Sequence, residues 1–214
     1  MDKAQIVKAL GELKKANKER KFKQTYDLIF TLKGLDLKKP DQHVDFYAQM
    51  PKPIRNNKIC ALVGPELKDD ASKTCDFSVA QTDFEGYDKK KAKKLAESYD
   101  YFIAQANIMG LVAKNFGKIF GPRGKMPNPK AGCVVPPKGS LANLYKKLQQ
   151  TQRIMAKTQP QIQCSVGKEG SADEDVAENV ISLYNQLVNH LVGRENNIKN
   201  IYLKLTMGKP VKVQ

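Results

Sequence analysis

Apolar residues in the first part of the chain change from a helical spacing to a strand spacing. Over residues 3–18 they recur every three or four positions while most lysines fall on the other side, which predicts an amphipathic, basic helix. Over residues 22–32 they alternate with polar residues, which predicts a half-buried strand that ends near Gly34. Residues 43–49 form a candidate second strand, and the prolines after it indicate a domain boundary close to Asn57.

The middle of the chain alternates short apolar runs with helical patterns. The predicted strands cover residues 59–63, 77–80 and 101–104. The predicted helices cover residues 66–73, 89–99, 108–119 and 140–150. Strands that alternate with helices form crossover units, so we expect a parallel sheet covered by helices. The first strand-to-helix turn reads Val-Gly-Pro-Glu and lacks the glycine pattern of a dinucleotide site.

After Gln152 the pattern resembles the start of the chain again. Residues 153–157 and 161–166 flank Thr-Gln-Pro and predict a hairpin. Ser171 and Glu174 have the spacing of a capping box, and the apolar stripe that follows predicts a helix of about five turns. The last strand is predicted to alternate from residue 201 and to end at Gly208. The two ends of the chain therefore share a pattern of amphipathic helices and alternating strands, which the middle lacks.

The charge of the chain indicates the kind of partner. Its 214 residues are enough for one large domain or two ordinary ones, each with a proper core. Lysine and arginine number 37 against 22 acidic residues, a net charge of +15. Such an excess favours a polyanion, most simply nucleic acid.

Several other classes of protein are disfavoured. The most apolar run, residues 101–113, is too short to span a membrane, and the N-terminus lacks a signal peptide's apolar core, so we expect a cytoplasmic protein without a membrane partner. The four cysteines are scattered and only two histidines occur, so we expect no metal site, no disulfide framework and no cofactor. Cys60 lies in an apolar run and is interpreted as a small buried side chain.

The stretch from Gly121 to Pro129 reads Gly-Pro-Arg-Gly-Lys-Met-Pro-Asn-Pro. Three prolines and two glycines rule out a helix or a central strand and predict a shaped loop that carries Arg123 and Lys125. A rigid loop with two cations suits phosphate. Composition taken alone favours a solvated connection between a helix and a strand, and both interpretations stay open.

The end of the last strand offers a second candidate site. Lys204 and Thr206 fall on its polar face, and Thr-Met-Gly then places a hydroxyl, a flexible thioether and an unobstructed backbone together. Such a surface can follow the wide, shallow minor groove of folded RNA, with Gly208 permitting close approach. The alternative is that Met207 and Phe22, which fall on apolar faces, belong to the core and that the lysines are ordinary surface charges. The five lysines within residues 89–94 are best interpreted as a solvated helix face.

Four segments resemble one known family. Residues 120–129 are similar to the signature loop of the large-subunit ribosomal protein L-one family. Thr206-Met207-Gly208 with residues 210–213 resembles the family's C-terminal RNA-contacting motif, residues 21–25 resemble its N-terminal strand, and residues 166–168 lie where it has a third element of that surface. The resemblance covers nearly the whole chain and is archaeal in type.

Three positions depart from the pattern expected of this family. Gly110 stands in place of a proline, Lys114 in place of an arginine, and Lys118 interrupts an apolar helix. All three lie in the middle of the chain, so they concern details of an inserted domain and leave the RNA-contacting segments unaffected.

The resemblance implies an α/β protein with the two-domain ribosomal protein L-one fold. Residues 1–57 and 153–214 would form a discontinuous, two-layer α+β domain that binds RNA. Residues 58–152 would form an inserted, three-layer α/β domain, Rossmann-like, with a parallel sheet. Periodicity does not reveal that discontinuity, which follows from the resemblance alone.

The resemblance also implies site residues and partners. The RNA-binding residues would be Lys21, Phe22, Gln24, Thr25, Gly167, Lys168, Lys204, Thr206, Met207 and Gly208. The signature loop of the inserted domain would comprise Gly121, Pro122, Arg123, Gly124, Lys125, Met126 and Pro127. The phenylalanine would pack on sugars or bases, Thr206 and Gln24 would form hydrogen bonds, and the lysines would neutralise phosphates. Expected partners are stalk ribosomal RNA, exit-site tRNA and the protein's own mRNA, bound by a chain that is monomeric when free.

An enzyme and a free RNA-binding regulator are the two alternatives to a ribosomal protein. An enzyme with a phosphate-binding loop is disfavoured, because Ile119 stands where such a loop needs its first glycine and Met126 where it needs a serine or threonine. No motif of a nucleophilic or zinc hydrolase occurs, and we expect no catalytic residues. A free RNA-binding regulator would use the same surface as a ribosomal protein. We expect a structural constituent of the large ribosomal subunit that binds stalk RNA, helps exit-site tRNA leave and represses its own mRNA.

Overall fold

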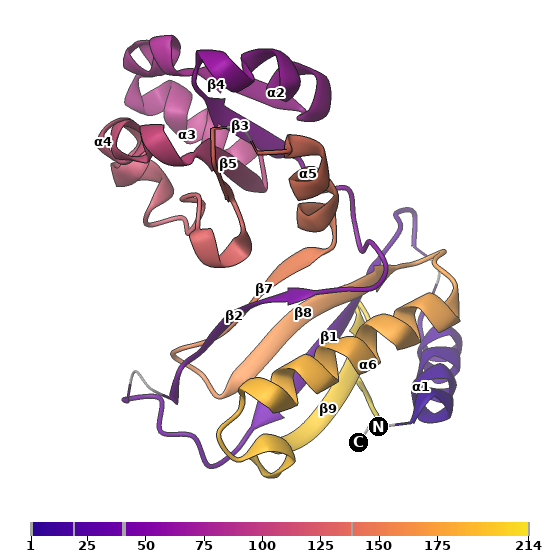
Figure 1. Ribbon diagram of the computed structural model, residues 1–214. Helices are drawn as coiled ribbons and strands as arrows, with labels where there is room; N and C mark the ends of the chain where they lie inside the picture. Colours follow the sequence, from indigo (N-terminus) through magenta and orange to yellow (C-terminus); the bar gives the residue numbers. More distant parts are fainter. Residues whose placement is uncertain (1, 19, 40–41, 138, 214) are drawn as a thin grey trace. The chain divides into compact units, whose positions relative to one another are not determined.

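The chain divides into two compact units. A computed structural model describes residues 2–18, 20–39, 42–137 and 139–213. The terminal unit comprises residues 1–55 and 150–214, and the inserted unit comprises residues 56–149. The chain therefore passes from one unit to the other after residue 55 and returns after residue 149. The α/β class is confirmed, with antiparallel strands in one unit and parallel strands in the other (Figure 1).

The terminal unit is a two-layer structure built from both ends of the chain. Its four-stranded antiparallel sheet has the order β10-β9-β1-β8, and a separate antiparallel pair joins β2 to β7. The strands are β1 (Thr25–Leu32), β2 (Val44–Gln49), β7 (Thr151–Ala156), β8 (Gln161–Lys168), β9 (Ile198–Leu205) and β10 (Val211–Lys212). Because β1 lies between two C-terminal strands, the two ends of the chain must fold together.

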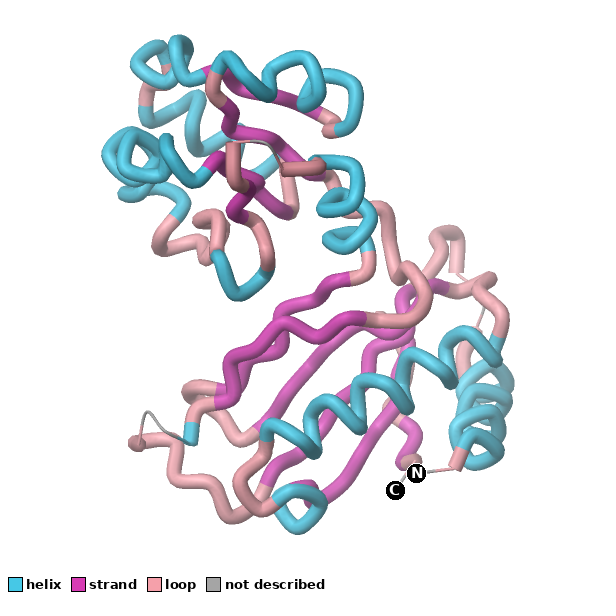
Figure 2. The backbone as a smooth tube through the Cα atoms, viewed as in Figure 1, coloured by secondary structure: helices cyan, strands magenta, loops and turns pink. Residues whose placement is uncertain are grey.

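Two helices supply the second layer of the terminal unit. Helix α1 (Lys3–Ala16) packs against β9 and β10, helix α6 (Asp173–His190) packs against β8, and both share one face of the sheet (Figures 1 and 2). Most residues of the apolar stripes predicted from the spacing are buried there, although Val7 on α1 is exposed. Alternate residues of β1, β2 and β9 are buried as well. A short 3-10 turn, η6 (Arg194–Asn197), connects α6 to β9.

Two local predictions in the terminal unit are wrong. Strands β7 and β8 do not form a hairpin, because β7 pairs with β2 and β8 pairs with β1 in long registers. The carbonyl of Pro160, in the predicted turn, accepts a hydrogen bond from Leu32 N (2.8 Å) and so extends the β1–β8 ladder. The capping box is also not formed, since α6 begins at Asp173 after Ala172, which has no side-chain cap. Three acidic residues in its first turn supply the favourable charge instead.

The inserted unit is a three-layer structure around a parallel sheet of order β4-β3-β5-β6. Its strands are β3 (Ile59–Val63), β4 (Phe77–Ala80), β5 (Tyr101–Gln105) and β6 (Val134–Val135). The first three match the predicted runs, and β3 is buried at every position, as expected of a central parallel strand. The two-residue β6 carries too little pattern to have been predicted.

Helices cover both faces of this sheet (Figure 1). Helices α3 and α4 pack on each other, as do α2 and α5. Their bounds are α2 (Lys68–Thr74), α3 (Lys89–Ser98), α4 (Met109–Phe120) and α5 (Leu141–Gln149), with short 3-10 segments at η2 (Pro65–Leu67), η3 (Gln81–Gly86), η4 (Ala106–Ile108) and η5 (Pro129–Ala131). Stacked and edge-to-face aromatic rings, Phe84, Phe102, Phe116 and Phe120, fill the α3–α4 side.

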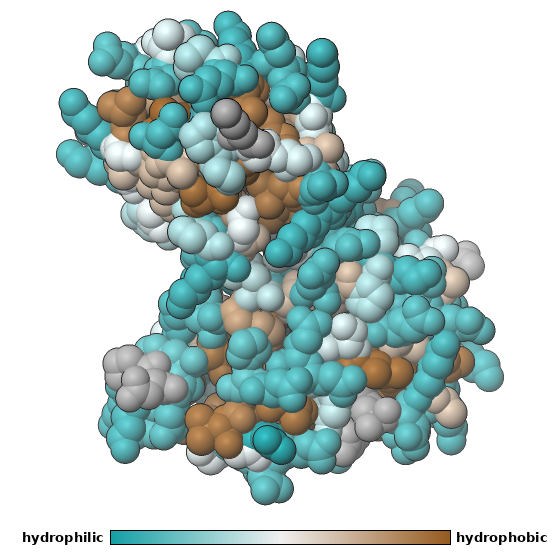
Figure 3. Space-filling view, viewed as in Figure 1, coloured by the Kyte–Doolittle hydropathy of each residue, from teal (hydrophilic) through white to brown (hydrophobic). Residues whose placement is uncertain are grey.

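The four cysteines are free and buried, which confirms the interpretation of Cys60 as a core side chain. Burial raises the pKa of the Cys75 and Cys133 thiols to about 11, so both remain protonated at neutral pH and unreactive. On the outside, hydrophilic side chains cover most of the face drawn in Figure 3.

Candidate nucleic-acid interface

Three segments that are far apart in the sequence meet at one end of the antiparallel sheet. In the strand register, Thr25 at the start of β1 lies opposite Lys168 at the end of β8, and Tyr26 lies opposite both Gly167 and Leu205. We call this the strand-end surface. It comprises Lys21, Phe22, Gln24, Thr25, Gly167, Lys168, Lys204, Thr206, Met207 and Gly208.

Hydrogen bonds lock the first and last segments of the strand-end surface together. The Thr206 hydroxyl accepts a bond from Thr25 N (3.0 Å), and Thr206 N donates to Thr25 O (3.1 Å). The Gln24 side chain is only 2% exposed, and its Oε1 accepts from Met207 N (3.1 Å). Gln24 and Thr206 thus hold the strand-end surface in shape, and their expected hydrogen bonds to RNA stay a prediction.

The two large apolar residues of the strand-end surface point outward. Phe22 is 51% exposed and Met207 is 62% exposed, so the alternative that they belong to the core is wrong. Strand β1 begins only at Thr25, after Phe22, and β9 ends at Leu205. Gly208 N then bonds back to Leu205 O (2.9 Å), which turns the chain and breaks the alternation before Met207.

Both glycines of the strand-end surface are needed for packing inside the protein. A Cβ atom on Gly167 would lie 2.8 Å from Val176 Cγ2 on α6. A Cβ atom on Gly208 would lie 2.4 Å from Asn17 Oδ1, at the end of α1. Real Cβ atoms do not approach this closely, so a larger residue at either position would displace its neighbour. The glycines therefore have a structural role whether or not RNA approaches them.

Charge on the strand-end surface is mostly positive and exposed. Lys21 and Lys168 are exposed, while Lys204 is half-buried and lies opposite Asp27 in the β1–β9 register. Burial raises the pKa of the Asp27 carboxyl, and Lys204 partly offsets that shift. Lys204 is thus partly balanced by its own domain, whereas the other two lysines are available to an anion.

Two residues that sequence reasoning missed support the strand-end surface. The Glu169 carboxylate accepts a hydrogen bond from Gln24 N (3.0 Å), and Glu169 N donates to Gln24 O (2.8 Å). Asn17 donates from Nδ2 to Leu13 O (2.8 Å) and packs on Gly208. The only sequence signal for Glu169 was its place directly after Gly167-Lys168. The only signal for Asn17 was its place near the end of the helix predicted over residues 3–18.

The signature loop belongs to the inserted unit and follows α4. Arg123 Nη2 lies 3.5 Å from Glu97 Oε1, and Lys125 Nζ donates to Tyr99 O. Gly124 has φ = +64°, a conformation that favours glycine. Met126 packs against the aromatic core and Pro127 is buried. Both cations of the loop therefore contact their own unit, and each keeps further N–H donors that could reach a phosphate.

The carboxyl edge of the parallel sheet is where a nucleotide-binding enzyme of this architecture would hold phosphate. The strand order places the switch point between β3 and β5. There Gly64 N donates to Oε1 of the buried Gln105 (2.8 Å), whose Nε2 donates to Glu66 Oε2 (3.2 Å). The backbone donor of the first turn is already used by a side chain, which disfavours the enzyme alternative.

Among residues 2–18, 20–39, 42–137 and 139–213, no group of three or more metal-ligating side chains is gathered at one place. Within the same ranges, no helix combines the length and the apolar character needed to cross a membrane.

Comparisons with known proteins give one consistent result. The sequence model of the Ribosomal protein L1p/L10e family matches residues 13–209. Large ribosomal subunit protein uL1 of Nanoarchaeum equitans is 39% identical over 213 residues, which cover 96% of this chain and 99% of the relative. The uL1 protein of Methanobrevibacter smithii is 38% identical over 98% of both chains. That of Pyrobaculum aerophilum is 34% identical over 100% of this chain and 95% of its own length.

A match over this length at these identities is far beyond a shared local motif, and it includes all three segments of the strand-end surface as well as the signature loop. The chain therefore belongs to the Ribosomal protein L1p/L10e family.

Proposed function

We propose that this chain is a structural constituent of the large ribosomal subunit and that its strand-end surface binds the stalk region of ribosomal RNA. Its family consists of ribosomal proteins and is not a family of enzymes. The observation that carries the proposal is the outward position of Phe22 and Met207 on a surface assembled from three distant segments. Large exposed apolar side chains on a surface that also carries lysines are typical of a site that a partner covers.

In the proposed binding mode, three kinds of residue have different roles: lysines, exposed apolar residues, and residues that hold the segments together. Lys21 and Lys168 neutralise phosphates, and this part of the affinity falls with salt. Phe22 and Met207 pack on sugars or unstacked bases, which gives a salt-independent part and a preference for shape. Gln24 and Thr206 keep the segments in register, so that little ordering is left to occur on binding.

Two further partners extend the same proposal. On the ribosome, in the cytoplasm, the inserted domain would face the exit site and help deacylated tRNA to leave. The free protein would repress translation by binding a site on its own mRNA that imitates the stalk RNA. Both roles rest on the family resemblance and on a net charge of +15, and the mRNA role would use the strand-end surface again.

The test is binding to a stalk-like ribosomal RNA fragment against a duplex of equal length, across a salt series. Met207→Asp should weaken binding to the fragment by about 1–3 kcal/mol, because it places a charge where an apolar contact is needed, and it should leave the fold intact since Met207 is exposed. Thr206→Ala should weaken binding by a similar amount, but through loss of the bond from Thr25 N.

Lys146→Ala, which removes an exposed charge from helix α5 of the other unit, is the control and should change the affinity far less. A preference for the fragment that persists at high salt supports a shaped surface. Equal binding to both RNAs that collapses with salt, or an unchanged affinity of Met207→Asp, would show that net charge explains the binding and that the RNA surface lies elsewhere.

A further inference from the structure

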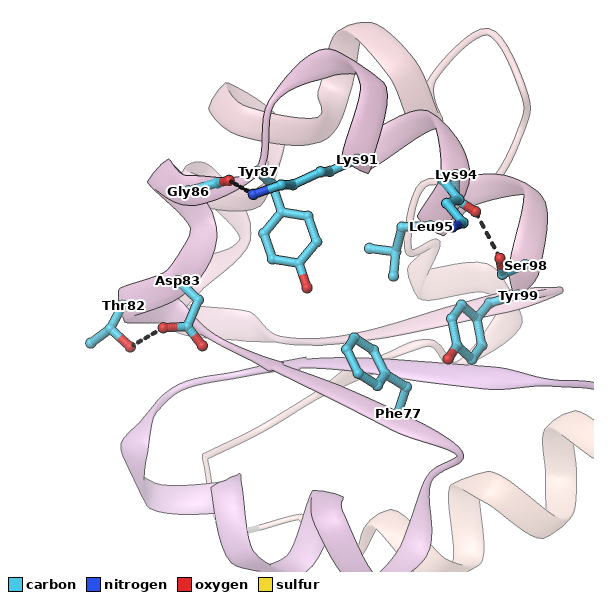
Figure 4. Close-up of a pocket in the computed structure, with 10 residues that line it drawn as sticks. All are labelled: Phe77, Thr82, Asp83, Gly86, Tyr87, Lys91, Lys94, Leu95, Ser98 and Tyr99. Atoms are coloured by element: carbon cyan, nitrogen blue, oxygen red, sulfur yellow. Dashed lines mark hydrogen bonds between the residues drawn. The ribbon is translucent and has the colours of Figure 1, made fainter.

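An aromatic pocket in the inserted unit is not used by the proposed function. It lies between α3, the 3-10 segment before it and the start of edge strand β4, and has a volume of about 640 Å³ (Figure 4). Three aromatic rings, two lysines and one aspartate give it its chemistry, namely Phe77, Tyr87, Tyr99, Lys91, Lys94 and Asp83. Pockets of this size hold small organic ligands or single residues of a polymer.

The aromatic rings form a preformed stacking platform. Phe77 and Tyr99 are stacked, with ring centroids 5.8 Å apart and an interplanar angle of 19°. Phe77 is 40% exposed although it is a phenylalanine on a strand. Tyr87 and Tyr99 each contact a buried core ring, so their positions are held from behind. Figure 4 shows the Tyr87 ring directed toward Phe77 and Tyr99 across the pocket.

The pocket also carries polar groups of both charges. Lys91 and Lys94 line it from α3, and Lys91 Nζ lies 3.4 Å from Gly86 O, a long contact that an anion could replace. The Asp83 carboxylate comes from the 3-10 segment before α3, where the Thr82 hydroxyl donates to it (3.2 Å) and leaves acceptor capacity unused. A planar ligand that carries both N–H donors and an anionic group would match these side chains.

We propose that this pocket binds one unpaired nucleotide of a single-stranded RNA, with the base stacked on Phe77 and Tyr99. The exocyclic amino group of the base donates to Asp83, and the phosphate contacts Lys91 and Lys94. The strand, rather than a free nucleotide, is favoured by the lysines that continue along α3 outside the pocket, Lys89, Lys90 and Lys93, all exposed. They supply positions for neighbouring phosphates that a mononucleotide could not use. The site is separate from the strand-end surface and does not depend on it.

The test uses the full chain and a single-stranded RNA hexamer that carries 2-aminopurine, whose fluorescence is quenched by stacking. Wild-type protein should quench it, and Phe77→Ala should raise the dissociation constant about tenfold, as loss of one stacking partner does. Phe77→Tyr should restore binding because it keeps the ring. Lys94→Gln should weaken binding several-fold, whereas Lys146→Gln, on exposed α5 of the same unit, should not.

Two comparisons decide between this site and its alternatives. Phe22→Ala, on the strand-end surface, should leave the Phe77-dependent quenching unchanged, and a loss of quenching in that variant would place the stacked base on the other unit. Adenosine monophosphate should bind at least tenfold more weakly than the hexamer. Equal binding of the two would overturn the assignment to a strand, and quenching that is absent or insensitive to Phe77→Ala in a folded protein would overturn the site.

Discussion

Gly208 illustrates how one residue can be understood differently before and after folding. In the sequence it follows Thr-Met, and a bare backbone at that point suggests close approach of RNA. In the structure the space that a side chain would fill is taken by Asn17 of α1. A methyl group added at this position would disturb RNA binding under the first explanation and the packing of Asn17 under the second. Measurements of affinity and of stability therefore separate the two.

Gly208→Ala should lower the free energy of unfolding by about 1 kcal/mol, because the Asn17 side chain must swing aside and lose its bond to Leu13 O. In an Asn17→Gly background, whose own starting stability is the reference, the same change should cost almost nothing. Chemical denaturation of the four proteins gives this cycle. An equal cost in both backgrounds would contradict the packing explanation, and a loss of RNA affinity in both would show that the ligand also needs the glycine.

Residues 22 and 207 show when the alternation of apolar and polar residues stops predicting which face of a sheet a side chain lies on. Both continue an apolar pattern in the sequence, and both lie just outside the strands to which that pattern belongs. Alternation identifies faces only while the backbone stays extended, and the turn from Leu205 to Gly208 ends that condition. The family resemblance reversed the core interpretation, and the structure gives the physical reason.

At the scale of elements, the β2–β7 pair is held by one ion-pair cluster. Arg153 on β7 donates to both carboxylate oxygens of Asp45 on β2, at 2.9 and 2.8 Å, and Lys157 Nζ lies 2.7 Å from Asp45 Oδ2. The Arg153 guanidinium also lies 5.9 Å from the centroid of the Tyr47 ring. Hydrogen bonds from Arg153, helped by Lys157, lower the pKa of Asp45 to about 2.

This shift predicts a pH dependence of stability. Because the Asp45 carboxyl binds a proton less readily in the folded protein than at its ordinary pKa of 3.8, its contribution is complete above about pH 4 and is lost as the pH falls through about 2. The stability gap between wild type and Asp45→Asn should therefore open across that window and stay constant above it. Urea unfolding followed by NMR signals of β2 and β7 measures the gap, and Glu12→Gln, an exposed carboxylate on α1, is the control. A gap that does not vary between pH 2 and 4 would contradict the role of this cluster.

The prediction of a hairpin between residues 153–157 and 161–166 also concerns elements, and it was wrong. Local sequence shows only that two strands follow each other across a turn. Which strands pair depends on how many residues can be matched in register. Strands β1 and β2, from the other end of the chain, pair with β8 and β7 over longer registers than the hairpin would allow. Strands β3, β4 and β5 of the inserted unit were predicted well because their partners are near in sequence and each is a short, mostly apolar run.

At the scale of the whole molecule, each unit has its own apolar core, and the two connections between the units run side by side. Met50 N donates to Gln150 O (2.8 Å) in the terminal unit. In the inserted unit, Asn57 N donates to Gln149 Oε1 and Gln149 Nε2 donates to Asn57 O, both at 2.7 Å. The chain thus leaves and re-enters each unit at one place, the arrangement that allows a domain to be inserted with little loop-closure cost.

Two separated proteins test this independence. Residues 56–149 alone should unfold cooperatively on heating, and the terminal unit, with residue 55 joined to residue 150 by a short glycine-serine linker, should bind the stalk RNA fragment within about threefold of the full chain. Calorimetry and RNA titration are the measurements. A fragment that is unfolded, or a terminal unit that loses its RNA affinity while folded, would show that the units depend on each other.

The sequence by itself determined the class of fold, the elements with strong periodicity and, through four matched segments, the family. These are local properties: burial of an apolar face dictates spacing, and backbone constraints of proline and glycine dictate loops. Only the tertiary structure decided that β1 completes a sheet with C-terminal strands, that Gln24 and Thr206 form hydrogen bonds within the protein, and that Phe22 and Met207 face outward. The sheet and the hydrogen bonds depend on contacts between residues more than a hundred positions apart, which leave no periodic trace in the chain. The outward position of Met207 depends on a turn that ends the alternation.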